Sequence, residues 1–298
     1  MPAQIIDGQA VAAAIRAELA AAVAGLRAQG VVPGLAVVVV GDDPASASYV
    51  AAKEKAAGEL GIAARVHRLP GGGDPAALSG AIGALIDRLN ADPAVDGMIL
   101  QLPLPAGVAA DPLLERMEPR KDVDGLHPSN QGLLLQGRAR YYPATPHGVQ
   151  QLLVRTGNDP GGKHVVIVGR STLVGLPLAA MLAQKRAGAN ATVTICHTGT
   201  RDLGAFTRQA DILVAAAGSP GMITADMVRR GAVVIDVGVN RVADATKKRG
   251  YRLAGDVDFD AVRAKAAWIT PVPGGVGPLT VIMLLTNVVR AARQFRAR

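Results

Sequence analysis

The sequence has few aromatic residues and almost no cysteine. Aromatic side chains make up 3% of the 298 residues, so the core must be built from Ala, Val, Leu and Ile. A single cysteine, Cys196, excludes an intrachain disulfide framework and fits a reducing compartment. The chain does not open on a basic region followed by an apolar signal core, and the runs "LAVVVVG" and "TVIMLLTNVV" are too short to span a membrane. We therefore expect a cytoplasmic protein without a membrane partner.

Acidic residues are fewer than basic ones, and the formal net charge is +8. Nucleic-acid binding is one use of such an excess, but the basic residues are scattered and aromatics that could stack on bases are nearly absent. We therefore expect no nucleic-acid partner, and an anionic small substrate is the better use of the charge. The five histidines lie far apart and the cysteine is alone, so the sequence indicates no metal site.

Short apolar runs alternate with helical patterns in two blocks of the chain. This alternation predicts an α/β protein with parallel sheets and helices on their faces, the second block being of Rossmann type. In the first block, the predicted strands are 35–40, 65–69 and part of 96–105, and the predicted helices are 8–29, 46–60 and 75–90. In the second block, strands are expected from residue 163 and at 192–196, 211–218, 232–238 and 267–270, with helices at 146–157 and 278–296. The polar, Gly- and Pro-rich stretch 119–147 is interpreted as a functional connector.

A glycine-containing turn, "GRSTLVG", follows the first strand of the second block and precedes a helix. Gly169 and Gly175 would allow close backbone approach, and a helix N-terminus offers free N–H groups to a phosphate. The spacing differs from the usual G-x-G-x-x-G, because Ser171 stands where a second glycine would be expected. An ordinary strand-to-helix turn therefore remains an alternative to a nucleotide site.

The end of the next strand bears on the choice of cofactor. "TVTIC" is followed by "HTGTR", which contains no acidic residue to hold ribose hydroxyls. Arg170, Thr198 and Arg201 could instead favour a 2′-phosphate. This pattern favours NADP over NAD, although the same residues could form a simple polar loop.

Ionisable groups stand at strand ends and on one helix of the first block. Tyr49 and Lys53 are four residues apart, so a helix places them on one face. Gln101 follows the apolar run "DGMIL", and Asp122 and Asp124 stand in "KDVDG"; parallel sheets collect their ligands at the carboxyl ends of strands. A lysine buried against an aromatic ring can act as a base, although most helix lysines are simply solvated. The Tyr-x-x-x-Lys pair of short-chain dehydrogenases is rejected, because there the glycine-rich turn precedes the pair.

Several blocks, taken together, resemble one family over residues 5 to 290. They include "GDDPASASYVAAKEKAAGELGI", "DGMILQLPLP", "KDVDGLHPSNQGLL", "GRSTLVGLP", "GDVDF" and "TPVPGGVGPLTVIMLL". The chain is similar to the bifunctional methylenetetrahydrofolate dehydrogenase/methenyltetrahydrofolate cyclohydrolase family. The resemblance implies two α/β domains around a cleft, a folate-binding catalytic domain of residues 1–145 plus 279–298 and a Rossmann-type NADP-binding domain of residues 146–278. It also implies a homodimer that is joined through elements of the nucleotide domain.

The resemblance also implies roles for individual residues. Lys53 matches the catalytic lysine, Gln101 the glutamine that tunes it, and Tyr49 the aromatic residue that shapes the folate site. Asp124 matches the acid that holds the pterin ring, and Ser46 a residue that supports the lysine. The loop that lines the folate site is matched by Pro273, Gly274 and Gly275. The nucleotide site is matched by Gly169, Arg170, Ser171, Gly175, Thr198 and Val239.

The chemistry implied by the resemblance has two steps. NADP⁺ takes a hydride from 5,10-methylenetetrahydrofolate, and water then converts the methenyl cation to 10-formyltetrahydrofolate. Lys53 would move protons in the second step, with a pKa lowered by burial and by the cation. Polyglutamylated tetrahydrofolates could use part of the positive charge. Two alternatives remain, a family member with one activity only and a nucleotide-binding protein without chemistry.

Overall fold

The computed structural model of the chain describes residues 2–247 and 250–296, without the side chains of residues 44–46 and 48. The chain divides into two compact units. One unit, called here the first α/β unit, contains residues 14–143 and 281–296. The other, called the Rossmann-type unit, contains residues 2–13 and 144–280.

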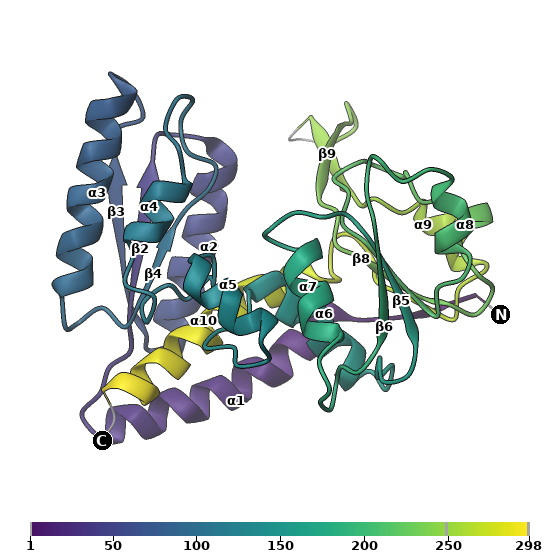
Figure 1. The fold of residues 1–298 in the computed structure, drawn as a ribbon, viewed down its shortest axis with the longest axis horizontal. Coiled ribbons are helices and arrows are strands. Elements are labelled where there is room, and N and C mark those ends of the chain that lie inside the picture. The colour runs from purple at the N-terminus through teal and green to yellow at the C-terminus, as the bar shows by residue number, and fades with distance from the viewer. Residues whose placement is uncertain (1, 248–249, 297–298) are drawn as a thin grey trace. The chain divides into compact units, whose positions relative to one another are not determined.

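The first α/β unit is built on a three-stranded parallel sheet in the order β3-β2-β4 (Figure 1). Its strands are β2 (Gly34–Val40), β3 (Ala63–Leu69) and β4 (Gly97–Leu100). All seven residues of β2 are buried, because it is the central strand and neighbours lie on both sides. Its helices are α1 (Gly8–Ala28), α2 (Pro44–Leu60), α3 (Pro75–Ala91), α4 (Asp111–Arg116), α5 (Pro128–Leu135) and α10 (Gly277–Phe295), of which α1 and α10 each begin in the other unit.

One core cluster of this unit lies between the sheet and α3. Asp74 begins that helix by accepting a hydrogen bond from the Ala77 amide (2.9 Å), with Pro75 in the first turn. Leu78, Ile82, Leu85, Ile86 and Leu89 then recur at helical spacing and pack against the buried side chains of β2 and β4. The cluster therefore holds α3 on one face of the sheet.

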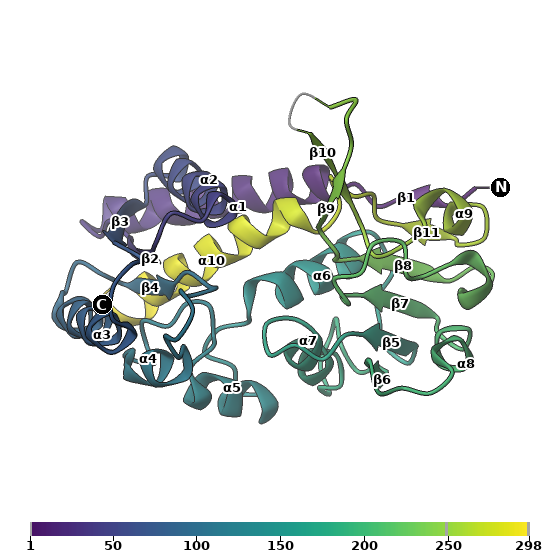
Figure 2. The same ribbon diagram turned by 90° about the horizontal axis from the view of Figure 1, so that it is seen from above.

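Helices α1 and α10 lie side by side in the first α/β unit, as the purple and yellow ribbons of Figures 1 and 2 show. Asn287, in α10, is buried and donates hydrogen bonds from its amide nitrogen to the carbonyl oxygens of Val123 and Tyr142, both at 2.8 Å. These bonds tie the C-terminal helix to segments more than a hundred residues earlier in the chain.

Helix α1 qualifies one expectation drawn from the sequence. It is long and apolar enough to cross a membrane by length and composition, and 28% of its most apolar 18-residue window is buried. This segment corresponds to the alanine-rich helix predicted at 8–29, whereas the runs "LAVVVVG" and "TVIMLLTNVV" are too short. Its buried residues recur every three or four positions along one face (Val11, Ile15, Leu19, Val23 and Leu26), as in the core-facing side of a helix.

The Rossmann-type unit contains a six-stranded parallel sheet in the order β1-β11-β8-β7-β5-β6. The strands are β1 (Gln4–Ile5), β5 (His164–Val168), β6 (Thr192–Cys196), β7 (Ile212–Ala215), β8 (Val233–Asp236) and β11 (Trp268–Ile269). Helices α6 (Ala144–Arg155) and α7 (Gly175–Leu182) lie on one side, and α8 (Leu203–Thr207) and α9 (Phe259–Arg263) on the other (Figure 2). The strand order reverses at β5, between β6 and β7, which is where such sheets bind nucleotides.

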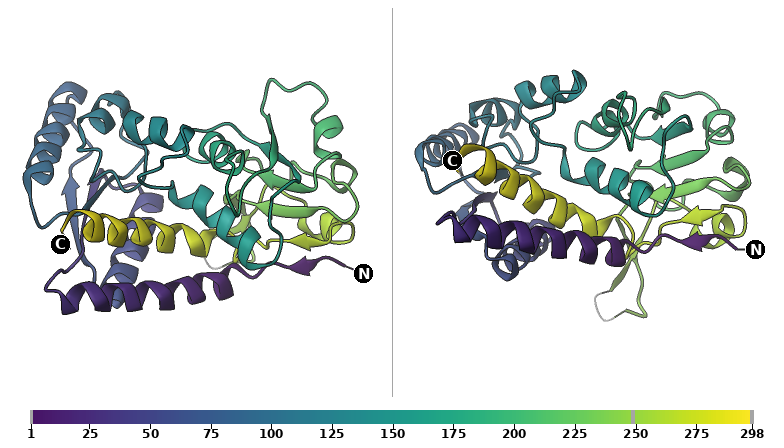
Figure 3. Two further views of the ribbon diagram at one scale, coloured as in Figure 1. Left: turned by 60° about the horizontal axis from the view of Figure 1, so that its bottom comes forward. Right: turned by 90° about the horizontal axis from the view of Figure 1, so that it is seen from below.

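Three features depart from the sequence-based expectation. Residues 2–13 were assigned to the first domain but lie in the Rossmann-type unit, because β1 pairs with β11 and the Ile6 amide donates to the Ile269 oxygen (2.9 Å). A hairpin of β9 (Asn240–Ala243) and β10 (Tyr251–Ala254) extends from this unit and was not predicted (Figure 3). The stretch 119–147, interpreted as a functional connector with no helix predicted before residue 146, contains helix α5 and the start of α6. The other expected boundaries, 145/146 and 278/279, lie within two residues of those between the units.

Candidate active site and nucleotide site

Lys53 and Gln101 form the centre of the candidate site in the first α/β unit. Lys53 lies on α2, and its Nζ donates a hydrogen bond to Gln101 Oε1 at 3.0 Å. Gln101 directly follows β4, and its Nε2 donates to the Leu102 carbonyl oxygen at 2.8 Å. Because the amide nitrogen is held by the backbone, the amide oxygen is turned toward the lysine. The backbone after β4 thus orients the Gln101 oxygen as the hydrogen-bond acceptor for Lys53 of α2.

Asp124 completes this group. Burial raises the pKa of the Asp124 carboxyl, and the nearby Lys53 cation partly opposes that rise. Asp122 stands two residues earlier, is 1% exposed, and accepts hydrogen bonds from the His127 amide (2.8 Å) and Asn130 Nδ2 (2.7 Å). These bonds hold the loop that carries Asp124, so the structure brings a cation, an amide and a carboxyl together.

Other residues of the same helix differ in their surroundings. Tyr49, one turn before Lys53, is 50% exposed, so its ring is open to a ligand. Lys55 is exposed and pairs with Glu59 at 3.9 Å, as expected of a solvated helix face. The supporting role predicted for Ser46 falls on a side chain outside the described residues.

The loop of Pro273, Gly274 and Gly275 lies between β11 and α10 in the Rossmann-type unit. The Gly8 amide donates to the Gly274 carbonyl oxygen (3.0 Å), and a Cβ on Gly8 would lie 1.7 Å from the Gly275 oxygen. The loop therefore packs closely on the start of α1, where only glycine fits. Its predicted role in lining the folate site stays a prediction.

The predicted nucleotide turn has the close backbone contacts that a phosphate cradle needs. Gly169 has a φ of 132°, and a Cβ there would lie 2.2 Å from the Ala216 carbonyl oxygen. Gly175 begins α7, and a Cβ on it would lie 2.0 Å from the Gly169 oxygen. Ser171 Oγ accepts a hydrogen bond from the Val174 amide at 3.1 Å. The turn thus requires glycine at both ends, as a dinucleotide turn does.

The end of β6 lies beside this turn in the sheet and carries no carboxylate of its own. The His197 amide donates to Thr200 Oγ1 (2.8 Å), which folds the loop and leaves Thr198 exposed. The first acidic residue, Asp202, accepts a hydrogen bond from the Ala205 amide as the cap of α8. Arg170 and Arg201 are exposed, so the residues present fit a ligand with an additional phosphate. Val239, after β8, is 46% exposed.

Sequence reasoning missed two buried aspartates next to these loops. Asp236 ends β8 and accepts hydrogen bonds from the amides of Gly238, Asp256 and Val257 at 2.9–3.0 Å. Burial is the main cause that raises the pKa of Asp236 to about 6, and the neighbouring Asp256 adds to it. The block "GDVDF" was noticed, but an aspartate in a sequence does not show which backbone amides will point at it.

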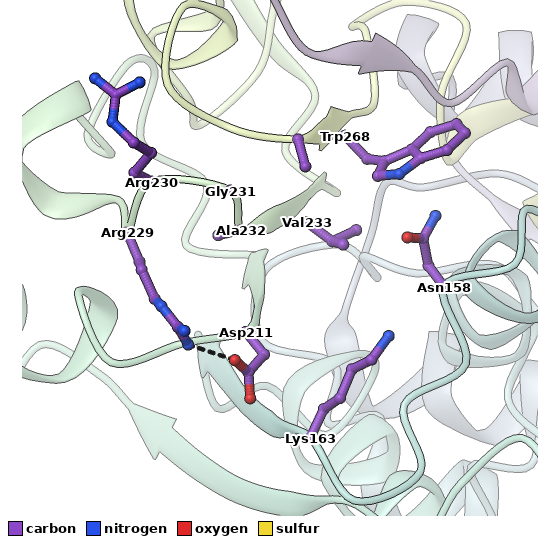
Figure 4. A pocket seen from close by; sticks show the side chains of 10 residues that line it. Asn158, Lys163, Asp211, Arg229, Arg230, Gly231, Ala232, Val233 and Trp268 are labelled. Carbon is purple, nitrogen blue, oxygen red and sulfur yellow. Dashed lines mark hydrogen bonds and ion pairs between the residues drawn. The ribbon is translucent and has the colours of Figure 1, made fainter.

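A separate pocket of about 420 Å³ lies at the amino ends of β5, β7, β8 and β11, at the sheet edge opposite to the nucleotide turn. In Figure 4, Arg229 reaches Asp211 and forms an ion pair with it, while the Trp268 ring lies across the pocket near Asn158. None of the residues proposed for catalysis or for binding folate or nucleotide lines this pocket.

The fold and these sites define a two-unit α/β protein of the dinucleotide-binding class. A family model described as the tetrahydrofolate dehydrogenase/cyclohydrolase catalytic domain matches residues 6–124, and one for the NAD(P)-binding domain of the same family matches residues 143–296. The chain belongs to the tetrahydrofolate dehydrogenase/cyclohydrolase family. The resemblance and the two-domain α/β class predicted from the sequence are thereby confirmed.

Relatives and solved structures match the chain along its whole length. The bifunctional protein FolD of Syntrophus aciditrophicus is 54% identical over 293 residues, which is 98% of both chains. FolD 1 of Myxococcus xanthus is 53% identical and covers 99% of this chain and 100% of its own. The structure of the Trypanosoma brucei methylenetetrahydrofolate dehydrogenase-cyclohydrolase, complexed with NADP cofactor and inhibitor, has a TM-score of 0.92 at 41% identity and covers 100% of both chains.

Proposed function

We propose that this protein oxidises 5,10-methylenetetrahydrofolate with NADP⁺ and hydrolyses the methenyl product to 10-formyltetrahydrofolate, supplying one-carbon units. The observation that carries the proposal is the hydrogen bond from Lys53 to Gln101 beside Asp124. This group lies in a domain that matches the family's catalytic model, and the nucleotide turn lies in the matching NAD(P)-binding domain. Relatives at more than 50% identity are bifunctional proteins.

The nucleotide, when bound, supplies a hydride acceptor. The glycine turn at Gly169 and Gly175 would hold its pyrophosphate against the N-terminus of α7. Arg170, Ser171 and Thr198 would contact the adenosine half, and Arg170 has the charge that a 2′-phosphate requires. Val239 would contact the other half. The chain's contribution to the oxidation is therefore orientation of the two rings.

The hydrolysis would depend mainly on residues of the first α/β unit. Asp124 would accept hydrogen bonds from the pterin's ring nitrogen and amino group, and Tyr49 would stack on the folate, assisted by the loop of Pro273, Gly274 and Gly275. Lys53, held by Gln101 Oε1, would move protons between water and the folate nitrogen while the five-membered ring opens. Ser46, whose side chain is not described, would support the lysine.

We also propose a homodimer, joined through elements of the Rossmann-type unit, that works in the cytoplasm. The single cysteine, Cys196, is free, as suits a reducing compartment. Leu253 of the β9–β10 hairpin is 36% exposed, and a partner that covers it would explain an apolar side chain there. Light scattering behind size-exclusion chromatography measures the mass; a monomer at micromolar concentration would contradict the proposal.

The test is a coupled assay with methylenetetrahydrofolate and either NADP⁺ or NAD⁺, following reduced cofactor and the absorbance of the methenyl compound. Reduced cofactor should form faster with NADP⁺, and methenyl absorbance should then decay. Absence of reduced cofactor with both nucleotides would refute the dehydrogenase. Oxidation without methenyl decay beyond the spontaneous rate would identify a family member with one activity, and nucleotide binding alone would identify a non-catalytic protein.

The Lys53→Met variant separates the two steps. We expect the enzymatic hydrolysis of methenyltetrahydrofolate to fall by roughly 100-fold or more, because general acid–base catalysis typically contributes that much, while hydride transfer falls less. Lys55→Met is the matched control, since Lys55 is exposed two residues along the same helix. Equal hydrolysis in both variants would show that the role given to Lys53 is wrong.

A further inference from the structure

Asp256 is a fully buried carboxylate that collects four hydrogen-bond donors. Its Oδ2 accepts from the amides of Ala217 (2.7 Å) and Gly218 (2.9 Å). Its Oδ1 accepts from the Ser219 amide (2.9 Å) and from Asn240 Nδ2 (2.9 Å). The side chain is 0% exposed, so these bonds replace all of its hydration. Three consecutive backbone amides converging on one carboxylate fix the course of the 217–219 loop.

The backbone also wraps closely around this carboxylate. A Cβ on Gly238 would lie 2.3 Å from Asp256 Cγ, so the turn after β8 passes directly against it. That turn leads to Val239 and to Asn240, which is itself one of the four donors. Asp256 thus connects the loop after β7 with the turn after β8.

Both segments stand at the carboxyl edge of the sheet, next to the nucleotide turn. Ala216 directly precedes the three amides that Asp256 holds. Its carbonyl oxygen lies so close to Gly169 that a Cβ on Gly169 would be 2.2 Å from it. In sheets of this order a dinucleotide straddles the reversal, with one half over β5 and β6 and the other over β7 and β8. The adenosine half belongs to the side of β6, so the nicotinamide half belongs over β7 and β8.

We propose that Asp256 is a positioning residue for the nicotinamide half of the NADP site, fixing the 217–219 loop and the Val239 turn as one cradle. The inference rests on the proposed function, because it assumes that the Rossmann-type unit binds NADP⁺. Asp256 itself is enclosed by backbone and acts through these segments without touching the ligand. The adenosine half, contacted by Arg170, Ser171 and Thr198, depends much less on it.

The Asp256→Asn variant tests the proposal, because each carboxylate oxygen accepts two of the four bonds. In either orientation of the new side-chain amide, its NH₂ group replaces an oxygen that accepts two hydrogen bonds. It therefore faces two N–H donors that have lost their acceptor. We expect the KM for NADP⁺ to rise about tenfold or more, since bonds to charged groups are lost. The inhibition constant of adenosine 2′,5′-bisphosphate should change by less than about twofold, and hydrolysis of methenyltetrahydrofolate, which needs no nucleotide, should be unchanged.

Asp258→Asn is the matched control. Asp258 is exposed two residues away and accepts one bond, from the Ala261 amide at 3.4 Å, as the cap of α9. An unchanged KM for NADP⁺ in Asp256→Asn would overturn the proposal. An equal loss of affinity for NADP⁺ and for adenosine 2′,5′-bisphosphate would overturn it as well. Failure of the proposed function itself shows separately, as a wild-type protein that transfers no hydride.

If Asp256→Asn does not fold, Asn240→Ala provides a milder test. It removes one donor to Asp256, together with a longer bond to the Ala254 oxygen (3.3 Å), and leaves the carboxylate and the three backbone amides in place. We expect the KM for NADP⁺ to rise about threefold or more, with the inhibition constant of adenosine 2′,5′-bisphosphate unchanged. A KM equal to that of the Asp258→Asn control would overturn the proposal.

Discussion

Asp236 should make the stability of the Rossmann-type unit depend on pH in a direction that is unusual for an aspartate. The side chain is 3% exposed, and its pKa is raised from 3.8 to about 6 in the folded protein. Desolvation outweighs three backbone amides that favour the charged form, and Asp256 adds a like charge. The folded state therefore binds a proton at a pH where the unfolded chain does not.

The sign and size of the effect follow from linkage. Because the pKa is higher in the folded state, the free energy of unfolding gains from Asp236 as the pH falls through about 6, and this gain is complete below about 4. The difference between the two pKa values corresponds to about 3 kcal/mol in total, at about 1.36 kcal/mol per pH unit. Between about pH 7.5 and about pH 5, roughly half of it, or about 1.4 kcal/mol, should appear.

Urea unfolding followed by tryptophan fluorescence measures this effect. Trp268 is the single tryptophan of the chain and pairs with Val233 at the start of β8, so it reports on the Rossmann-type unit. The Asp236→Asn variant has no titrating group at this position, and other carboxyls such as Asp211 cancel in the comparison. We subtract the free energy of unfolding of the variant from that of the wild type. This difference should rise by about 1.4 kcal/mol as the pH falls from about 7.5 to about 5. A difference that stays constant across this range would refute the assigned pKa and its cause.

Two further substitutions test backbone crowding and a partly buried ion pair. Gly169→Ala should raise the KM for NADP⁺ about tenfold or more while hydrolysis of methenyltetrahydrofolate continues. The reason is that residue 169 has a φ of 132° and a Cβ there would lie 2.2 Å from the Ala216 oxygen. A KM equal to that of the wild type would contradict this. Arg296→Met should lower the free energy of unfolding of the first α/β unit by about 1–3 kcal/mol in circular-dichroism melts, because Asp96, whose side chain is 2% exposed, loses its partner at 2.9 Å. An unchanged melting temperature would show that the Gly34 amide alone satisfies Asp96.

Long apolar segments were predictable because burial on both faces leaves a continuous pattern. The strand expected at 35–40 is Gly34–Val40, the one at 192–196 is Thr192–Cys196, and the helix expected at 75–90 is Pro75–Ala91. The two residues of β1 and the half-exposed hairpin have too short or too polar a pattern to be recognised. Their pairing depends on a neighbour that the sequence does not identify, which explains why residues 2–13 were placed in the first domain.

The sequence by itself determined which residue types were available for the chemistry. Blocks such as "DGMILQLPLP", "KDVDGLHPSNQGLL" and "TPVPGGVGPLTVIMLL" were enough to identify the family, and that resemblance nominated Lys53, Gln101 and Asp124 for the site. Only the tertiary structure decided that the Gln101 amide turns its oxygen to Lys53, because the bond that orients it comes from the Leu102 backbone. Likewise, Asp256 became a candidate only when three amides converged on it. Hydrogen bonds between distant segments depend on where the backbone runs, and that is set by the packing of the whole unit.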